Sequence, residues 1–544
     1  MNPRIGRWGA RLLALAAGSL AAVAHPPFGF LPGLLGYALL LQLVDTTEAP
    51  RPLHSAFFRG WLGGFAYFFI GCWWIAEAFL VDAEGQGWMA PIAITLVPAG
   101  LALFWGAACA LYRRLKPEGA VRVLAFAGAL AGFEWLRGHL LTGFPWNLPG
   151  ETWAAGSPPS QAAALIGAYG LTWVTVAIAA ACAVPFRGSS RRQGLVTIAV
   201  ALAGLAALYG YGWVRLSNPP SAHPRAPVVR VVQANVAQEK KYDAASFRSI
   251  VERYTALTAQ PGARRPDIVV WPEGAIPAAA DEFLAPGGWT LEAIQASLQN
   301  GQTLILGAYR IGGTAAEPTY FNSLITLRAE PAGLRVTGLY DKHRLVPFGE
   351  FLPLESALAP MGIKNLTKIG DGFSHGPPPA PISPLAVPRT QPLICYEVLF
   401  PDLVRRAVVQ GPRPRWIVNV SNDAWYGPTS GPWQHLNIAA YRSIETGLPM
   451  VRATPTGVSA VIDAFGRSSP ATRIGMGRAG ILDVSIPAAT MATPFVRLGE
   501  FPFAALLVIS LLSCIRRRHA PRVSSAVRKE PYETEREAGR EARH

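Results

Sequence analysis

The sequence predicts a multi-pass α-helical membrane domain joined to a water-soluble α/β domain. Hydrophobic residues make up 51% of the 544-residue chain, which is too apolar for an ordinary soluble enzyme. Long apolar runs gather before residue 214 and return once near the C-terminus. Between them, short runs rich in β-branched residues alternate with helical stretches and turns, the pattern of a layered α/β fold.

Eight apolar runs predict about eight transmembrane helices, because crossing a bilayer takes roughly 20 apolar residues. They are Gly9–Ala24, Phe30–Val44, Ala56–Leu80, Trp88–Tyr112, Val121–Leu141, Gln161–Phe186, Gly194–Trp213 and Leu498–Ile515. The first two runs are short. A signal peptide followed by one anchor is therefore an alternative, since arginines precede an Ala/Leu-rich core that ends in Ala22-Val23-Ala24.

Basic residues follow every second run, and this alternation predicts the orientation. They are Arg51; Arg113, Arg114 and Lys116; Arg187, Arg191 and Arg192; and Arg516 to Arg518. Because positively charged loops stay in the cytoplasm, we expect both termini there and the α/β domain on the other side. The formal net charge is +15, but the basic residues collect at helix ends instead of forming a stripe, which argues against nucleic acid as a partner.

These patterns divide the chain into five segments. We expect a membrane domain with seven helices at 1–213, a Pro-rich linker at 214–227 and a catalytic α/β domain at 228–495, followed by an eighth helix at 496–515 and a basic cytoplasmic tail at 516–544.

Glu273 follows a predicted strand in Val269-Val270-Trp271-Pro272-Glu273-Gly274. A buried strand that meets a proline and then a glycine-flanked turn would hold one carboxylate fixed yet reachable, which suits a general base. A capping or salt-bridging glutamate is the alternative.

Lys342 lies in a dense charge cluster that runs from Tyr340 to Glu350. Strand alternation from Tyr340 would point Lys342 to the face opposite Asp341 and His343, so this one lysine is expected to face inward. There it could stabilise an oxyanion, with Glu350 holding it. A solvated basic face is the alternative.

Cys395 ends the apolar strand Pro392-Leu393-Ile394 and precedes a helix-like start, whereas the other four cysteines lie in or beside long apolar runs. A thiol at such a turn is placed as a nucleophile, with backbone amides available for an oxyanion hole and the helix N-terminus favouring a thiolate. A buried structural cysteine is the alternative, and a pair with His435 is the main rival constellation. The sequence contains no metal-ligand spacing of histidines or cysteines and no Gly-rich phosphate loop, so neither a metal nor a cofactor is expected.

The order Glu273, Lys342, Cys395, each at a strand end, resembles the nitrilase superfamily. This resemblance implies an α-β-β-α sandwich and a Glu-Lys-Cys triad. Residues 1 to about 515 are similar more narrowly to the apolipoprotein N-acyltransferase family. The supporting stretches are Glu134-Trp135-Leu136-Arg137, Gly143-Phe144-Pro145-Trp146, Val232-Gln233-Ala234-Asn235, Val346 to Pro353, Ser421 to Gly427, and Gly431 to His435.

By this resemblance Cys395 is the nucleophile, Glu273 the general base and Lys342 the group that stabilises the tetrahedral intermediate. Supporting and substrate-binding roles are expected for Glu350, Tyr396, Glu397, Trp425, Asn235 and Tyr242. Two positions depart from the family pattern: Pro455 stands where asparagine is usual, and Tyr242 where tryptophan is common.

The resemblance implies a multi-pass enzyme of the bacterial inner membrane, with its catalytic domain on the periplasmic side. It would pass a fatty acyl group from a phospholipid, through a cysteine thioester, to the N-terminal amine of a diacylglyceryl-apolipoprotein, the last step of lipoprotein maturation; a monomer is expected. A membrane-anchored nitrilase or amidase that hydrolyses small amides or nitriles is the first alternative. A transporter or scaffold is the second, with Glu134 and Arg137 as candidate pathway charges or, alternatively, a structural ion pair.

Overall fold

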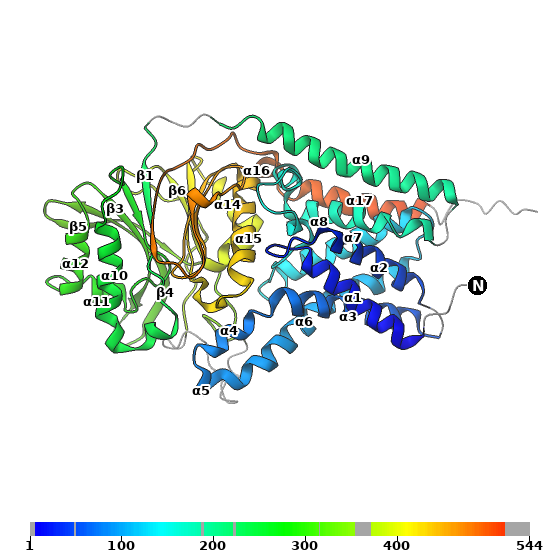
Figure 1. The fold of residues 1–544 in the computed structure, drawn as a ribbon, viewed down its shortest axis with the longest axis horizontal. Coiled ribbons are helices and arrows are strands. Elements are labelled where there is room, and N and C mark those ends of the chain that lie inside the picture. Colours follow the sequence, from blue (N-terminus) through cyan, green and yellow to red (C-terminus); the bar gives the residue numbers. More distant parts are fainter. Residues whose placement is uncertain are drawn as a thin grey trace, which may run out of the picture.

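The computed structural model describes residues 6–47, 50–186, 190–220, 225–314, 316–353 and 372–516. Its helices form an elongated bundle at one end of the molecule, and its two β-sheets lie at the other (Figure 1). The predicted tail beyond Arg516, part of the predicted linker, and Arg187 of the basic loops lie outside the described residues.

Each apolar run of the sequence overlaps with one helix of the bundle. The bundle helices are α1 (Arg7–Val23), α2 (Leu35–Asp45), α3 (Pro52–Cys72), α6 (Ala90–Leu115), α7 (Val121–His139), α8 (Ala163–Ala181), α9 (Arg191–Leu216) and α17 (Phe501–Arg516). Three helical stretches, Ala83–Leu115, Pro159–Phe186 and Arg191–Leu216, are long and apolar enough to cross a membrane. A helical membrane region is therefore present, and the number of eight crossings stays a prediction.

The third apolar run, which the sequence predicts as one helix, is divided in the structure. α3 ends at Cys72, and a short helix α4 (Ile75–Leu80) leaves the bundle toward the sheets, followed by α5 (Ala83–Gln86) (Figure 1). The Trp74 indole packs against Trp146, with ring centroids 4.4 Å apart, and against Tyr426 of the outer domain, at 4.5 Å. This packing holds the break in place.

Two sheets pack face to face in the outer domain. The six-stranded sheet has the order β11-β1-β2-β3-β4-β5 and the five-stranded sheet the order β10-β9-β8-β7-β6. The strands are β1 (Val228–Gln233), β2 (Ile268–Val270), β3 (Thr303–Gly313), β4 (Pro318–Glu330), β5 (Gly333–Asp341), β6 (Thr390–Ile394), β7 (Trp416–Val420), β8 (Met450–Ala453), β9 (Ser459–Ile462), β10 (Arg473–Ile474) and β11 (Gly480–Ser485). β1, β2 and β3 are parallel, as are β6, β7 and β8.

Helices cover the outer face of each sheet. α10 (Phe247–Ala259), α11 (Ala280–Phe283) and α12 (Trp289–Ser297) lie on the six-stranded sheet, and α14 (Pro401–Val408) and α15 (Gly431–Thr446) on the other (Figure 1). An apolar core that includes Val270, Leu324, Ile394 and Val418 fills the space between the sheets. The predicted sandwich of helices, two sheets and helices is therefore the observed architecture of this domain.

α15 joins the outer domain to the bundle. Almost all of its residues are buried, because one side packs on the five-stranded sheet and the other on the loop between α7 and α8. Trp74 and Trp146 both donate their indole N–H to Gln434 Oε1, at 3.2 and 2.9 Å. Within α8, Gly167 has φ 67°, and a Cβ there would lie 2.4 Å from the Phe495 ring of α16 (Pro494–Leu498). The two parts of the chain thus share one packed interface.

Candidate active site

Glu273 lies on the turn that follows β2, beside the neighbouring strand β3. A Cβ added to Gly307 of β3 would lie 2.5 Å from the Glu273 Cα, so only glycine allows this close approach. Glu273 is 8% exposed. The end of one parallel strand and a glycine of the next therefore fix the carboxylate at the carboxyl edge of the sheet.

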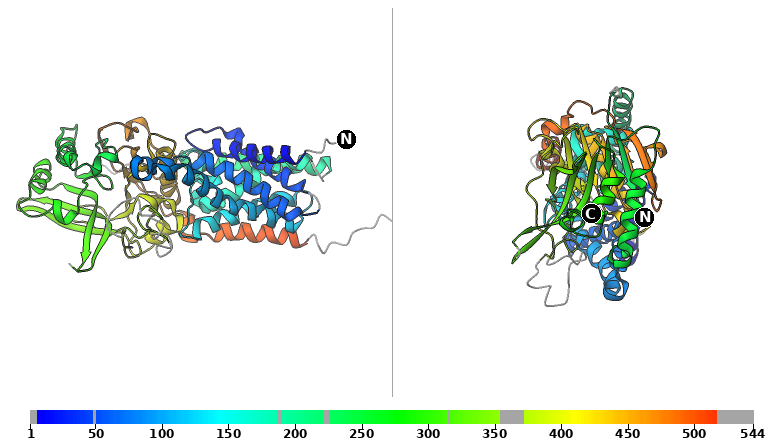
Figure 2. Two further views of the ribbon diagram at one scale, coloured as in Figure 1. Left: turned by 90° about the horizontal axis from the view of Figure 1, so that it is seen from below. Right: turned by 90° about the vertical axis from the view of Figure 1, so that its left-hand side faces the viewer.

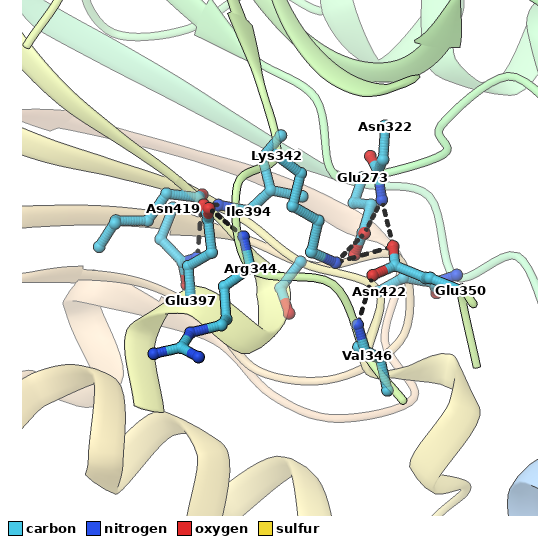
Figure 3. A network of polar contacts seen from close by, with 12 residues as sticks. Glu273, Asn322, Lys342, Arg344, Val346, Glu350, Ile394, Glu397, Asn419 and Asn422 are labelled. Atoms are coloured by element: carbon cyan, nitrogen blue, oxygen red, sulfur yellow. Dashed lines mark hydrogen bonds and ion pairs between the residues drawn. The ribbon is translucent and has the colours of Figure 1, made fainter. Parts of the chain in front are cut away.

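Lys342 follows β5 directly and is buried, with 1% of its surface exposed. Its Nζ lies 2.9 Å from Glu350 Oε1 and 3.3 Å from Glu273 Oε1 (Figure 3). Burial by itself would lower the pKa of Lys342, but the charges of Glu273 and Glu350 outweigh burial and raise the pKa well above its usual range. Lys342 is therefore a fixed cation, as its predicted inward orientation requires.

Asn322 of β4 completes this network. Its Nδ2 donates to both Glu273 Oε1 and Glu350 Oε1 at 2.7 Å (Figure 3). The other oxygen of Glu350 accepts from the Val346 backbone N–H at 2.9 Å. Glu273 Oε2, in contrast, is buried and has no hydrogen-bond partner among the described residues. One carboxylate oxygen of Glu273 is thus anchored, and the other remains available to take a proton.

Cys395 occupies the turn between β6 and the 3-10 segment Cys395–Leu399. Its φ is +48°, in the left-handed region that non-glycine residues rarely adopt. Strained positions of this kind cluster at functional sites. Glu273 and Lys342 both act electrostatically on the thiol, and Ser421, whose hydroxyl donates to Asp423 Oδ1 at 2.8 Å, lies close to it.

The predicted preference for a thiolate is wrong for the resting protein. Burial raises the pKa of Cys395, and the charge of Glu273 raises it further, to about 12; the attraction of Lys342 only partly offsets this. The thiol is therefore protonated in the resting protein. Burial of the thiol thus raises its pKa more than the backbone N–H groups at the start of the 3-10 segment lower it.

Glu397 links the cysteine turn to the lysine turn. Its Oε2 accepts from the Ile394 backbone N–H at 2.8 Å, and its Oε1 accepts from Tyr340 Oη at 2.7 Å and from the His343 backbone N–H at 2.8 Å. Through these bonds one carboxylate ties the residue before Cys395 to the residue after Lys342 (Figure 3). The supporting role that the resemblance implies for Glu397 stays a prediction.

The other predicted residues lie at different distances from the triad. The Tyr396 hydroxyl donates to the Gly143 carbonyl in the loop after α7, at 2.5 Å. Asn235 donates its side-chain N–H to the Gly477 carbonyl and its backbone N–H to the Pro455 carbonyl. Trp425 is half-buried in the 3-10 segment Asp423–Tyr426. The Tyr242 side chain lies outside the described residues.

His435, the rival partner for Cys395, belongs to a second buried cluster. Its Nδ1 lies 3.0 Å from Asp423 Oδ1, and Arg452 bonds to the same carboxylate at 2.8 Å. Burial lowers the pKa of His435, and Arg452 lowers it further, so the imidazole is neutral. Asp423 and Arg452 thus hold His435, whose ring also lies beside the Cys395 backbone, while Glu273 and Lys342 act on the thiol.

Sequence reasoning missed Asn322 and Arg452, which are buried polar side chains on strands. A polar residue inside an otherwise apolar strand was the available signal. Among the described residues no group of His, Cys, Asp or Glu has the arrangement of a metal site.

Two family models match the chain. Residues 17–181 match the apolipoprotein N-acyltransferase N-terminal domain, and residues 228–493 match carbon-nitrogen hydrolase. An amidase from Nesterenkonia sp. is a similar solved structure, with 16% identity and a TM-score of 0.31 over 49% of this chain and 93% of that chain.

Two curated relatives cover almost the whole sequence. The apolipoprotein N-acyltransferase of Caulobacter vibrioides is 55% identical over 92% of this chain and 94% of its own length. That of Rhodopseudomonas palustris is 37% identical over 94% of this chain and 96% of its own. A buried Glu-Lys-Cys site in a two-sheet sandwich, a helical membrane region and these identities together show that the chain belongs to the apolipoprotein N-acyltransferase family.

Proposed function

We propose that the protein transfers a fatty acyl group from a phospholipid to the N-terminal amine of an S-diacylglyceryl-cysteine apolipoprotein through a thioester on Cys395. Family membership supports this reaction, and the relatives' names do not favour the amidase alternative. The observation that carries the assignment of residues is the contact of Lys342 with both Glu273 and Glu350, beside the Cys395 turn.

The first half-reaction acylates the thiol. Glu273 takes the proton of Cys395 through its unpartnered Oε2, and the sulfur attacks the ester carbonyl of the phospholipid. Lys342 and the backbone N–H of Tyr396 stabilise the oxyanion. Collapse of the tetrahedral intermediate breaks the bond to the glyceryl oxygen, which takes the proton from Glu273 and leaves as lysophospholipid.

The second half-reaction transfers the acyl group. The acceptor amine attacks the thioester carbon and gives a proton to Glu273. The sulfur then leaves and recovers that proton, which restores the resting thiol. Since the pKa of Cys395 is raised by burial, the thiol needs Glu273 in each cycle.

We propose an orientation in which the outer domain lies on the periplasmic side of the inner membrane and eight helices cross the bilayer. The first residues of α1 and the last residues of α17 lie at the end of the bundle that is farther from the sheets, which supports cytoplasmic termini (Figure 2). The site would then be near the outer leaflet, a short path for both lipid-anchored substrates.

Intact-protein mass spectrometry after exposure to phospholipid tests the proposed function. We expect the wild-type protein to gain the mass of one acyl chain and the Cys395→Ser variant to gain no thioester. Addition of a diacylglyceryl peptide should then return the wild-type mass to its initial value. Ammonia release from small amides without acylation by phospholipid would support the amidase instead, and full complementation of a depleted strain by Cys395→Ser would support a binding role.

A further inference from the structure

Lys241 has a buried amine that the reaction described above does not use. It lies in the 3-10 segment Glu239–Tyr242, and its Nζ is buried without a hydrogen-bond partner among the described residues. A Cβ built on Gly274, the residue after Glu273, would lie 3.7 Å from this Nζ. The amine therefore reaches the wall of the active site beside the general base.

Two more buried polar atoms of this wall lack partners in the part of the chain that the structure describes. They are Glu273 Oε2 and Asn422 Oδ1. Asn422 is tied to the Lys241 segment, because its Nδ2 donates to Gln238 Oε1 at 2.9 Å and the Lys241 backbone N–H donates to the Gln238 carbonyl at 3.1 Å. One donor and two acceptors without partners among the described residues thus lie on segments that meet near Glu273 and Lys342 (Figure 3).

Buried polar atoms without partners are costly, and a set of them at an active site indicates a ligand that supplies the missing bonds. Burial lowers the pKa of Lys241 to about 8, although Glu273 attracts the ammonium. The ligand must therefore offer a hydrogen-bond acceptor to Lys241 and an N–H to Glu273 within a short distance. An N-terminal amino-acid residue has this arrangement, since its amine nitrogen and its own carbonyl oxygen are roughly 3 Å apart.

We propose that Lys241 binds the carbonyl oxygen of the acceptor's N-terminal residue while the α-amine of that residue lies at Glu273 Oε2. This inference rests on the proposed function and assigns Lys241 to the second half-reaction alone. By fixing the carbonyl, Lys241 sets the direction from which the amine approaches the thioester, and Asn422 Oδ1 is placed to accept the second amine hydrogen.

The charges of the site favour a neutral carbonyl over the phosphate of the donor lipid. Lys342 and Lys241 supply two cations, and the carboxyl groups of Glu273, Glu350 and Glu397 lie beside them, so these five groups carry no excess positive charge. A phosphodiester would add a negative charge beside Glu273 and oppose the oxyanion of the reaction. An ester carbonyl of the donor has the same hydrogen-bonding chemistry as the peptide carbonyl, and the two half-reactions separate these sources.

The test measures the half-reactions separately on the full chain in lipid nanodiscs. Lys241→Met keeps the length of the side chain and removes the donor, and Lys240→Met, at an exposed neighbour, is the matched control. We expect Lys241→Met to form the Cys395 acyl-enzyme at close to the wild-type rate and to transfer it to a diacylglyceryl-cysteine peptide roughly tenfold more slowly, the effect of one lost hydrogen bond to a charged group. Lys240→Met should match wild type in both steps.

Normal transfer by Lys241→Met would overturn the inference. Slowing of acylation by the same factor would also overturn it, because Lys241 would then serve the donor lipid or Glu273. Acylation of Cys395 also reports whether a variant is folded. A wild-type protein that never acquires an acyl group contradicts the proposed function. A Lys241→Met variant with normal acylation and normal transfer contradicts only the role of Lys241.

A second measurement needs no variant. Pre-acylated wild-type enzyme is offered S-diacylglyceryl-cysteine amide or the matching cysteamine, which lacks the carbonyl group. The rates are compared per unprotonated amine across pH, since the two amines differ in basicity. We expect the cysteamine to react roughly tenfold more slowly; equal rates would overturn the inference.

Discussion

At the scale of single residues, Glu273 has two opposing effects on Cys395. Its charge helps to raise the pKa of the thiol in the resting protein, whereas in the proposed mechanism its Oε2 removes the thiol proton. The resting site therefore holds a protonated thiol of low reactivity.

The Glu273→Gln variant separates these effects. Loss of the negative charge should lower the pKa of Cys395, so alkylation of this thiol by iodoacetamide at pH 9 should become faster than in wild type. Loss of the base should slow acylation by phospholipid roughly 10²- to 10⁴-fold. Peptide mapping by mass spectrometry follows the alkylation, with Cys395→Ala as the background for the other thiols. Alkylation that slows together with acylation would contradict this account.

Among the secondary-structure elements, the close approach of β2 and β3 sets the position of Glu273, the proposed general base. In Gly307→Ala the new Cβ would meet the Glu273 backbone at 2.5 Å, which must displace the turn. We expect acylation to fall roughly a hundredfold, because catalysis is sensitive to displacements of about 1 Å. Gly480→Ala in β11, where a Cβ meets nothing within 4 Å, should keep near-normal activity in the same single-turnover assay. Equal activity of the two variants would show that Glu273 tolerates the shift.

The positions of Glu273, Lys342 and Cys395 after strand ends could be predicted from the sequence, and their catalytic roles stay a prediction. An apolar run followed by a turn and one reactive side chain is a local pattern, so it can be recognised in the sequence without knowledge of the tertiary structure. Asn322 gives no such signal. It lies within β4, and only the strand order brings its amide to both carboxylates.

The break between α3 and α4 could not be predicted either. Apolar residues continue on both sides of Trp73 and Trp74, so hydropathy reads one helix from Ala56 to Leu80. What divides it is tertiary packing, since the Trp74 indole contacts Trp146 and Tyr426, which are far away in the sequence. Contacts of this kind carry no periodic signal.

At the scale of the whole molecule, a buried charge cluster joins the loop after α7 to α15. Arg442 lies 3.3 Å from Glu151 and 2.8 Å from Glu445, and the other oxygen of Glu445 accepts from the Ala168 backbone N–H at 2.8 Å. Burial raises the pKa of Glu151 and of Glu445 to about 7, against the attraction of Arg442. Because both carboxylates share one arginine, they titrate as a pair.

This cluster predicts a pH dependence of stability. Below pH 4.5, Glu151 and Glu445 are protonated in both the folded and the unfolded chain. Between pH 4.5 and 7 these two carboxyl groups lose their protons in the unfolded chain but keep them in the folded chain. The free energy of unfolding therefore falls as the pH rises toward 7, and this contribution is lost above pH 7. Glu151→Gln removes one of these titrating groups. Between pH 5 and pH 8 we expect the free energy of unfolding of the variant to fall by on the order of 2 kcal/mol less than that of wild type, and its Tm to fall correspondingly less. Thermal unfolding in detergent measures this, with the exposed Glu252→Gln as the control. A wild-type Tm that rises over this interval would contradict the assignment.

Because α15 is buried on both sides, the outer domain alone would lack the partner of one of these sides. Excision of residues 228–493 would uncover Leu436 and Tyr441 and leave Arg442 without Glu151. Such a fragment would expose an apolar surface, with an arginine that lacks one of its carboxylate partners, where the bundle packs in the intact protein. We expect it to aggregate in water. Screening for inhibitors therefore calls for the intact chain.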